Sequence, residues 1–239
     1  MHSQGSISAA TSRIHLSQSA ITQALSRLEK ALGQALFTRS SKGLHSTEVG
    51  KIFLRRVERA IRWLKSVDAV LVPKDTGKSR TLYRLFTTTQ LRALITVVEY
   101  GNYTLAANHL QLAQPTVHRA VREMETVCGE SFFRRSPSGV EPSWQTRQVA
   151  RYISLFFAEL EQGMDEISEY QGRMTGSLRV GCLPLARTRM VPHAVTKLLQ
   201  EFPAARVSII DGPYEEQLQS LLHGHLDIIV GALREPSPS

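Results

Sequence analysis

The chain has 239 residues, of which 42% are hydrophobic and 21% charged, and its formal net charge is +8. This apolar content excludes a wholly disordered chain, and the length allows one large domain or two to three small ones. No run of about 18 uncharged apolar residues is present. The two cysteines, Cys128 and Cys182, are too few for a disulfide framework or a zinc module. We expect a soluble cytoplasmic protein without a membrane segment, a metal site or a cofactor.

The positive charge is concentrated towards the N-terminus. Residues 1–136 carry a net charge of +11, residues 137–175 carry −3, and residues 176–239 are neutral. Such asymmetry is typical of proteins that contact a polyanion, although many soluble proteins are basic as well. The charge is consistent with a nucleic-acid partner and does not by itself establish one.

An internal repeat organises the first part of the chain. Residues 5–43 align without a gap on residues 101–139 when the sequence is shifted against itself by 96 positions. The identical pairs include Gly5/Gly101, Ala10/Ala106, Leu16/Leu112, Gln18/Gln114, Ala24/Ala120, Glu29/Glu125, Gly33/Gly129, Phe37/Phe133, Arg39/Arg135 and Gly43/Gly139. One supersecondary unit therefore occurs twice, as a first and a second copy.

The second copy shows most clearly what the unit is. A helix is predicted over Gln90–Tyr100, with Thr88 or Thr89 as its cap and Gly101 as its stop. One apolar face of this helix is expected to be buried, and it contains Leu91, Leu94, Ile95 and Val98. A short helix over Leu105–Gln111, capped by Thr104, is expected to follow.

A tight turn at Ala113–Pro115 leads into a further helix that Gly129 ends. Its expected buried side is formed by Val117, Val121, Met124 and Cys128. Residues 131–135 then form a short strand that leads into a turn at residues 136–139, which is typical of a β-hairpin wing. Helices joined by a tight turn and followed by a wing predict a winged helix-turn-helix.

Both copies resemble the DNA-binding signature of LysR-type transcriptional regulators. The resemblance in the first copy is carried by Ser17–Thr22, Leu28-Glu29, Leu32-Gly33, Leu36-Phe37 and Arg39. In the second copy it is carried by Ala106-Ala107, Leu110, Gln114–Val117, Glu125, Gly129, Phe133 and Arg135. The doubling departs from the family, which normally carries one such module. The first copy also begins at Met1 without a counterpart of the helix at residues 90–100, so we expect it to be the less stable copy.

A long amphipathic helix follows each predicted wing. The apolar positions Phe53, Val57, Ala60, Leu64, Val67 and Leu71 recur 96 residues later as Val149, Ile153, Phe156, Leu160, Gly163 and Ile167. A spacing of alternating four and three residues favours pairing with another helix. The resemblance implies that these linker helices form a homodimer, and the alternative is that each packs on its own domain.

The C-terminal part alternates strands and helices, which predicts a parallel sheet. Strands are expected at residues 178–181, 207–210 and 226–230, and helices at residues 190–202 and 213–223. This pattern resembles the start of the family's effector domain, which is built like a periplasmic binding protein. Because the chain stops at Ser239, we expect a truncated domain whose cleft for a small-molecule effector is incomplete.

Duplex DNA requires cations and donors for its phosphates and side chains that reach base edges. The expected base-reading face contains Gln18, Ser19, Thr22 and Gln23 in the first copy and Gln114, Pro115, Thr116, His118, Arg119 and Arg122 in the second. The wings are expected to add Arg39, Lys42, Arg134 and Arg135. His118 stands where the family usually has a small hydroxyl residue, so the second copy is expected to bind a different base or to bind poorly.

These observations predict a mainly α-helical protein with two winged helix-turn-helix modules and a partial α/β domain. We expect the first module and its linker helix at residues 1–72, a linker at 73–88, the second module at 89–172 and the effector-type domain at 173–239. The predicted function is sequence-specific DNA binding in transcriptional regulation, not enzyme catalysis. Two alternatives stay open, an inactive fragment of such a regulator and a small-molecule binding protein with a helical adaptor.

Overall fold

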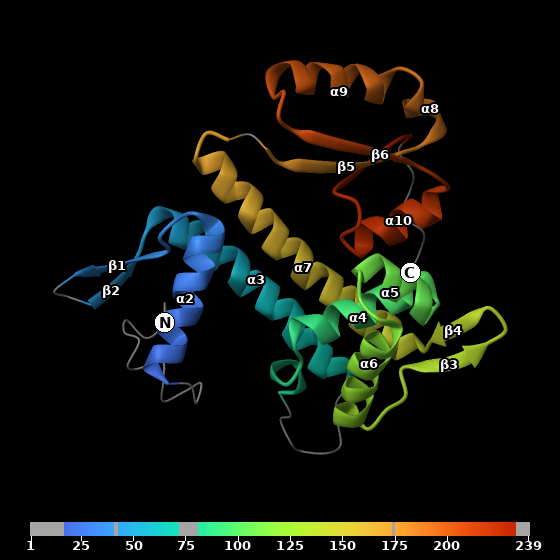
Figure 1. Cartoon of the computed structure of the whole chain (residues 1–239). Helices are drawn as coiled ribbons and strands as arrows, with labels where there is room; N and C mark the ends of the chain where they lie inside the picture. The colour runs from blue at the N-terminus through green and yellow to red at the C-terminus, as the bar shows by residue number, and fades with distance from the viewer. Residues whose placement is uncertain (1–16, 41–42, 72–80, 174, 233–239) are drawn as a thin grey trace. The chain divides into compact units, whose positions relative to one another are not determined.

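A computed structural model describes residues 17–40, 43–71, 81–173 and 175–232 (Figure 1). The chain divides into two compact units, each built from separated segments. Unit 1 consists of Met1–Glu58, Glu159–Leu178 and Arg189–Ser208, and unit 2 of Arg59–Ala158, Arg179–Thr188 and Ile209–Ser239. Residues 73–80 of the predicted linker (73–88) lie outside the described residues, and its second half contains a short 3-10 helix, η3 (Leu82–Arg84).

Unit 1 begins with α2 (Gln18–Leu32), which leads into an antiparallel hairpin of β1 (Phe37–Ser40) and β2 (Gly43–Ser46). The hydroxyl of Ser17 accepts a hydrogen bond from the Ala20 amide at 3.2 Å and so caps the helix. Gly33 ends it with φ of +66°, a conformation that favours glycine. The helix and the wing predicted for the first copy are therefore confirmed.

The core of unit 1 lies between this hairpin and two long helices, α3 (Glu48–Leu71) and α7 (Trp144–Tyr170). Its buried members come from the hairpin entry, the start of α3 and the end of α7, and they are Leu36, Val49, Phe53 and Ile167. The partly buried side chains packed against them are Leu25, Leu32, Phe37, Ile52 and Val57. The first copy therefore buries its apolar residues partly against a helix that follows the second copy.

Unit 2 contains α4 (Thr88–Tyr100), α5 (Tyr103–Leu110) and α6 (Gln114–Cys128), followed by the antiparallel hairpin of β3 (Phe133–Ser136) and β4 (Gly139–Pro142). Their shared core contains Leu91, Leu94, Val97, Ala106, Ala107, Val117, Val121, Met124 and Phe132. On α4, Val97 is fully buried, whereas Ile95 and Val98 of the predicted face are only half-buried. Cys128 is also only half-buried at the end of α6.

The two predicted caps in unit 2 are wrong. Thr87, not Thr88 or Thr89, caps α4, because its hydroxyl accepts from the Gln90 amide while the Gln90 side chain accepts from the Thr87 amide. Asn102, not Thr104, caps α5, because its side-chain oxygen accepts from two amides of the first turn. Each helix consequently begins two residues earlier than the sequence predicted.

The apolar positions predicted on the two long helices are buried. Phe53, Ala60, Leu64, Val67 and Leu71 of α3 are at most 8% exposed, and so are Val149, Ile153, Phe156 and Ile167 of α7. Val57 and Leu160 are half-buried, and Gly163 is buried. A segment of α3 lies against a segment of α7 in each unit, as the stacked rings of Trp63 and Tyr152 in unit 2 illustrate.

The predicted α/β alternation is confirmed. It consists of β5 (Ser177–Cys182), α9 (Met190–Glu201), β6 (Arg206–Asp211), α10 (Tyr214–Leu222) and β7 (Ile228–Val230). The strand order is β6-β5-β7, and β5 pairs with β7 in parallel. A short helix that the sequence did not predict, α8 (Pro184–Arg187), follows β5. In the part of the chain that is described, no helix is both long and apolar enough to cross a bilayer.

Candidate nucleic-acid interface and ligand cavity

The first turns of α2 present short polar side chains to solvent. Gln18, Ser19 and Gln23 are exposed, while Thr22 is partly buried and its hydroxyl donates to the Gln18 carbonyl oxygen at 2.8 Å. The hydroxyls of Ser17 and Ser19 lie 2.9 Å apart. Three of the four predicted side chains on α2 can therefore reach a ligand. The Thr22 hydroxyl is already hydrogen-bonded within its own helix.

The wing of the first copy is the hairpin of β1 and β2. Arg39 lies in β1, where its backbone pairs with Leu44. Lys42, the other cation predicted on this wing, lies outside the described residues. The contacts of the Arg39 and Lys42 side chains therefore stay a prediction.

The equivalent face of α6 is more basic. Gln114, Pro115, Thr116, Arg119 and Arg122 are all exposed. No side chain caps the N-terminus of α6 at Ala113, and Pro115 stands in its first turn. Uncapped amides at a helix start carry partial positive charge and attract phosphate oxygens. The start of α6 thus combines amide donors, hydrogen-bonding side chains and arginines on a single helix.

His118 differs from the other predicted residues because it is partly buried. Its ring lies 5.1 Å from the ring of Tyr103, which in turn lies 6.0 Å from that of Phe133. Burial, followed by the charge of Glu125, raises the pKa of Tyr103 to about 12. Tyr103 therefore stays neutral and acts as an apolar support that joins α5, α6 and β3. This residue was not among the predicted site residues, and its aromatic side chain directly after a helix cap was the available signal.

The two wing arginines of the second copy have different surroundings. The guanidinium of Arg134 donates to Glu141 on the neighbouring strand at 2.7 and 2.9 Å. Arg135 is exposed, and within residues 81–173 no hydrogen bond or ion pair of its side chain is found. A hollow of about 300 Å³ separates this wing from α6, with His118, Arg122 and Arg135 among its lining residues. Arg135 is thus the better placed of the two to receive an external anion.

The helices α2 and α6 each carry a glutamate that holds the following wing. In the second copy, Glu125 is 8% exposed and accepts a hydrogen bond from the Phe132 amide at 2.7 Å. In the first copy, Glu29 accepts from the Leu36 amide at 2.8 Å and the Phe37 amide at 3.2 Å. The sequence analysis found this pair as an identity of the repeat but assigned it no role. The contact fixes the wing relative to α2 in the first copy and to α6 in the second.

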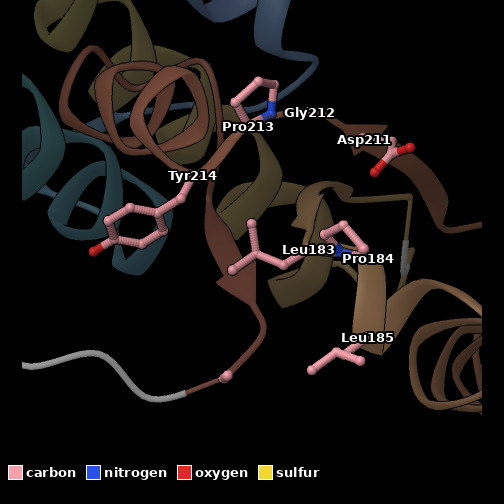
Figure 2. Close-up of a pocket in the computed structure, with 8 residues that line it drawn as sticks. Leu183, Pro184, Leu185, Asp211, Gly212, Pro213 and Tyr214 are labelled. Carbon is pink, nitrogen blue, oxygen red and sulfur yellow. The ribbon is translucent and has the colours of Figure 1, made fainter.

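A cavity of about 520 Å³ lies in unit 2 at the carboxyl ends of β5, β6 and β7 (Figure 2). Its lining is mostly apolar and consists of Leu183, Pro184, Leu185, Asp211, Gly212, Pro213, Tyr214 and Ala232. Asp211 forms an ion pair with Arg187, so part of its charge is compensated. Cys182 directly precedes this lining and is fully buried, and burial raises the pKa of its thiol.

Comparison with protein families identifies the class of this chain. The model of the family described as bacterial regulatory helix-turn-helix protein, lysR family, matches residues 1–51 and 88–145. The LysR substrate binding domain matches residues 171–239. The chain therefore belongs to the LysR family of bacterial transcriptional regulators.

Two curated relatives agree with this assignment. The chain is 31% identical over 96% of its length to the HTH-type transcriptional regulator GalR of Pseudomonas putida, of which it covers 57%. It is 31% identical over 61% of its length to the HTH-type transcriptional regulator PcaQ of Agrobacterium fabrum, of which it covers 47%. A solved full-length OxyR variant from Pseudomonas aeruginosa matches 63% of this chain and 50% of that one at 25% identity, with a TM-score of 0.47. The chain thus spans about half the length of the relatives it matches.

Proposed function

We propose that this chain is a sequence-specific DNA-binding transcriptional regulator located in the cytoplasm. The observation that carries the proposal is the exposed first turns of α6 together with the exposed Arg135 on the adjoining wing. The helix offers side chains of the type that pair with base edges, and the wing offers a cation for the phosphate backbone. Membership of a family of transcriptional regulators, rather than enzymes, supports the same conclusion.

In this proposal the chain contains tandem winged helix-turn-helix modules, with linker helices α3 and α7. The two separate matches of the helix-turn-helix family support the doubling. We assign the first module to residues 1–72, the connecting segment to 73–88, the second module to 89–172 and the effector-type domain to 173–239. In this proposal, pairing of α3 with α7 holds the recognition helices of the two modules, α2 and α6, together.

Base recognition and phosphate contact are tested by separate substitutions. Selection from a library of random duplexes first supplies a bound sequence, and fluorescence anisotropy then measures its affinity. Gln114→Ala should relax the preference at one base position, because a bidentate base contact contributes about 1–3 kcal/mol of discrimination. Arg135→Ala should weaken binding to all duplexes and reduce the slope of affinity against salt by about one.

The matched control is Arg206→Ala, which removes an exposed positive charge from β6, outside the recognition helices and wings. Its affinity should equal that of the parent protein. If Arg206→Ala weakened binding as much as Arg135→Ala, only net charge would matter and the wing assignment would be wrong. Gln18→Ala, measured in parallel, decides whether the first copy also contacts bases.

A second candidate function is binding of a small effector in the cavity beside Leu183 and Tyr214 (Figure 2). The apolar lining and the compensated charge of Asp211 favour a small, largely apolar molecule. Thermal-shift screening of the full chain should find compounds that raise the unfolding temperature, and Leu183→Asp should abolish that response. A response that survives Leu183→Asp would place the ligand elsewhere.

A further inference from the structure

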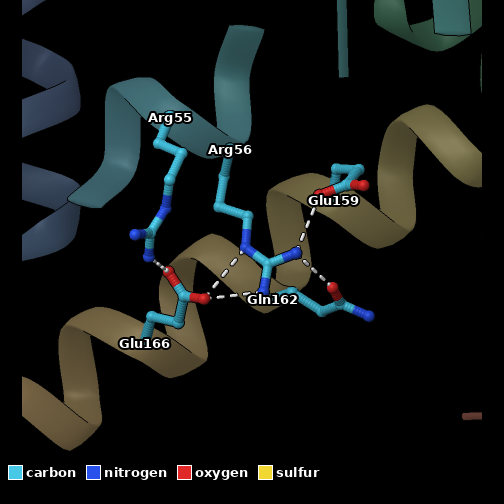
Figure 3. A network of polar contacts seen from close by, with 5 residues as sticks. All are labelled: Arg55, Arg56, Glu159, Gln162 and Glu166. Atoms are coloured by element: carbon cyan, nitrogen blue, oxygen red, sulfur yellow. Dashed lines mark hydrogen bonds and ion pairs between the residues drawn. The ribbon is translucent and has the colours of Figure 1, made fainter. Parts of the chain in front are cut away.

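The linker helix α3 carries an arginine whose acceptors in unit 1 lie on α7 (Figure 3). The guanidinium of Arg56 donates to Glu159 at 2.8 Å, to Gln162 at 2.6 Å and to Glu166 at 2.6 and 3.1 Å. The Arg56 side chain is 15% exposed and that of Glu159 is 9% exposed. Arg55 adds a bond to Glu166 at 3.0 Å. A partly desolvated guanidinium with this many acceptors is sensitive to the identity of the opposite helix.

The backbones approach closely at the same place. A Cβ atom added at Gly163 of α7 would lie 3.1 Å from the Cβ of Arg56 and 3.3 Å from the Phe53 ring. A side chain at this position would require these neighbours to shift by a few tenths of an ångström. Steric fit and ion pairing therefore specify the same contact between the two helices.

Unit 2 contains the counterpart of this contact. The rings of Trp63 on α3 and Tyr152 on α7 stack, with centroids 6.1 Å apart and planes inclined by 18°. The repeat relates Arg56 to Tyr152 and Trp63 to Glu159, since each pair is separated by 96 positions. The pairs Arg56–Glu159 and Trp63–Tyr152 thus occupy equivalent positions in one symmetric contact between the helices. The first pair is an ion pair, and the second is a stack of two aromatic rings.

This difference disfavours pairing between identical helices. If α3 paired with α3 of a second copy in the same register, Arg56 would face Trp63 instead of Glu159. If α7 paired with α7, Tyr152 would face Glu159, and the nearly buried carboxylate would lose its guanidinium. Leaving a buried charge without its partner is strongly destabilising. Side chains that are mismatched in the wrong pairing are a common source of specificity.

The overall charges of the helices agree with the local contacts. From their sequences, α3 carries a net charge of +3 and α7 a net charge of −3. Burial disfavours the charged form of Glu166, but its bonds from Arg56 and Arg55 outweigh this effect and hold its pKa below the usual value. The opposite net charges of α3 and α7 attract each other in the mixed pair. In a pair of two α3 helices or two α7 helices, like charges would repel.

We propose that the linker-helix surface of α3 takes as its partner α7 of the same chain, so that one polypeptide forms the two-helix arrangement that two copies would otherwise provide. The homodimer implied by the resemblance then becomes a pairing of two linker helices within one chain. Covalent connection supports this choice, because it gives the two helices a high effective concentration. The proposal concerns helix pairing and does not depend on DNA binding.

A designed disulfide tests which helices meet. The full chain with Cys128→Ala and Cys182→Ala receives Arg56→Cys and Gly163→Cys, whose Cβ atoms would lie 3.1 Å apart, within a few tenths of an ångström of disulfide geometry. After mild oxidation, we expect a bond within one chain, which keeps the mass at 26.7 kDa on a non-reducing denaturing gel. A dimer of doubled mass, or a folded protein that forms no bond, would overturn the proposal. Contacts between copies through another surface do not alter this readout.

Charge variants provide an independent test that keeps Gly163. Arg56→Glu should increase the unfolding equilibrium constant at least about tenfold, whereas Arg62→Glu, the same change at an exposed position of α3, should alter it less than about threefold. Adding Glu159→Arg and Glu166→Arg to Arg56→Glu should restore part of the loss. If Arg56→Glu and Arg62→Glu had equal effects on stability, the contacts of Arg56 would not determine which helix pairs with α3.

Discussion

Replacement of Glu125 by alanine should loosen the wing of the second copy. The lost contact is a hydrogen bond of 2.7 Å from the buried Phe132 amide to a carboxylate that is 8% exposed. A buried donor without an acceptor costs about 1–3 kcal/mol. The second contact of Glu125, at 3.1 Å from Arg122, adds little, because the Arg122 side chain is 62% exposed. We expect a loss of about 2 kcal/mol, which corresponds to about a 30-fold change in an equilibrium constant.

Hydrogen exchange at the Phe132 amide measures this loss locally. Its exchange should accelerate about 30-fold in Glu125→Ala and less in Glu125→Gln, which keeps an oxygen acceptor. Glu130→Ala, a change at an exposed glutamate just beyond α6, is the matched control and should leave the Phe132 amide unchanged. An acceleration of less than about threefold in Glu125→Ala would refute the reasoning that this glutamate holds the wing.

Three further predictions concern the stability of the copies and two ionisable groups. Amides of α2 should exchange at least about tenfold faster than those of α6, because Leu28 is 38% exposed whereas its counterpart Met124 is fully buried; equal protection would contradict this. Alkylation of Cys128 in a Cys182→Ala protein should keep accelerating up to about pH 11, because burial raises the pKa of its thiol to about 11; a plateau near pH 9 would contradict it. Because the pKa of Glu166 is lowered in the folded state, its ion pairs should stabilise the fold above about pH 4.3, and this stabilisation should disappear as the pH falls further. Acid unfolding of Glu166→Gln, which lacks the effect, provides the comparison.

Much of the fold could be predicted because the repeat doubles the signal. Gly33 and Gly129 end equivalent helices with positive φ, and each hairpin begins at the second residue of an apolar pair. The spacing of four and three residues on α3 and α7 identified their buried faces correctly, since helical periodicity dictates which side chains share a face. The strand and helix alternation after residue 173 was equally clear.

Other features depend on contacts that a linear pattern does not contain. Thr87, Thr88 and Thr89 are all acceptable caps, and only the reciprocal bonds with Gln90 select Thr87. The supporting position of Tyr103 arises from the packing of three elements. Similarly, the apolar pattern predicted a pairing helix for α3 but not which helix, because Arg56 and its acceptors are separated by more than a hundred residues.

The central claim, that this chain presents a cationic recognition surface to duplex DNA, is tested most directly by the salt dependence of binding. The full chain is titrated into a fluorescent duplex obtained by selection, at 50 and at 200 mM salt. Six or more phosphate contacts should lower the affinity about 1,000-fold or more over this range. The account would be contradicted by an absence of binding to any duplex at 50 mM salt, or by an affinity that does not change with salt.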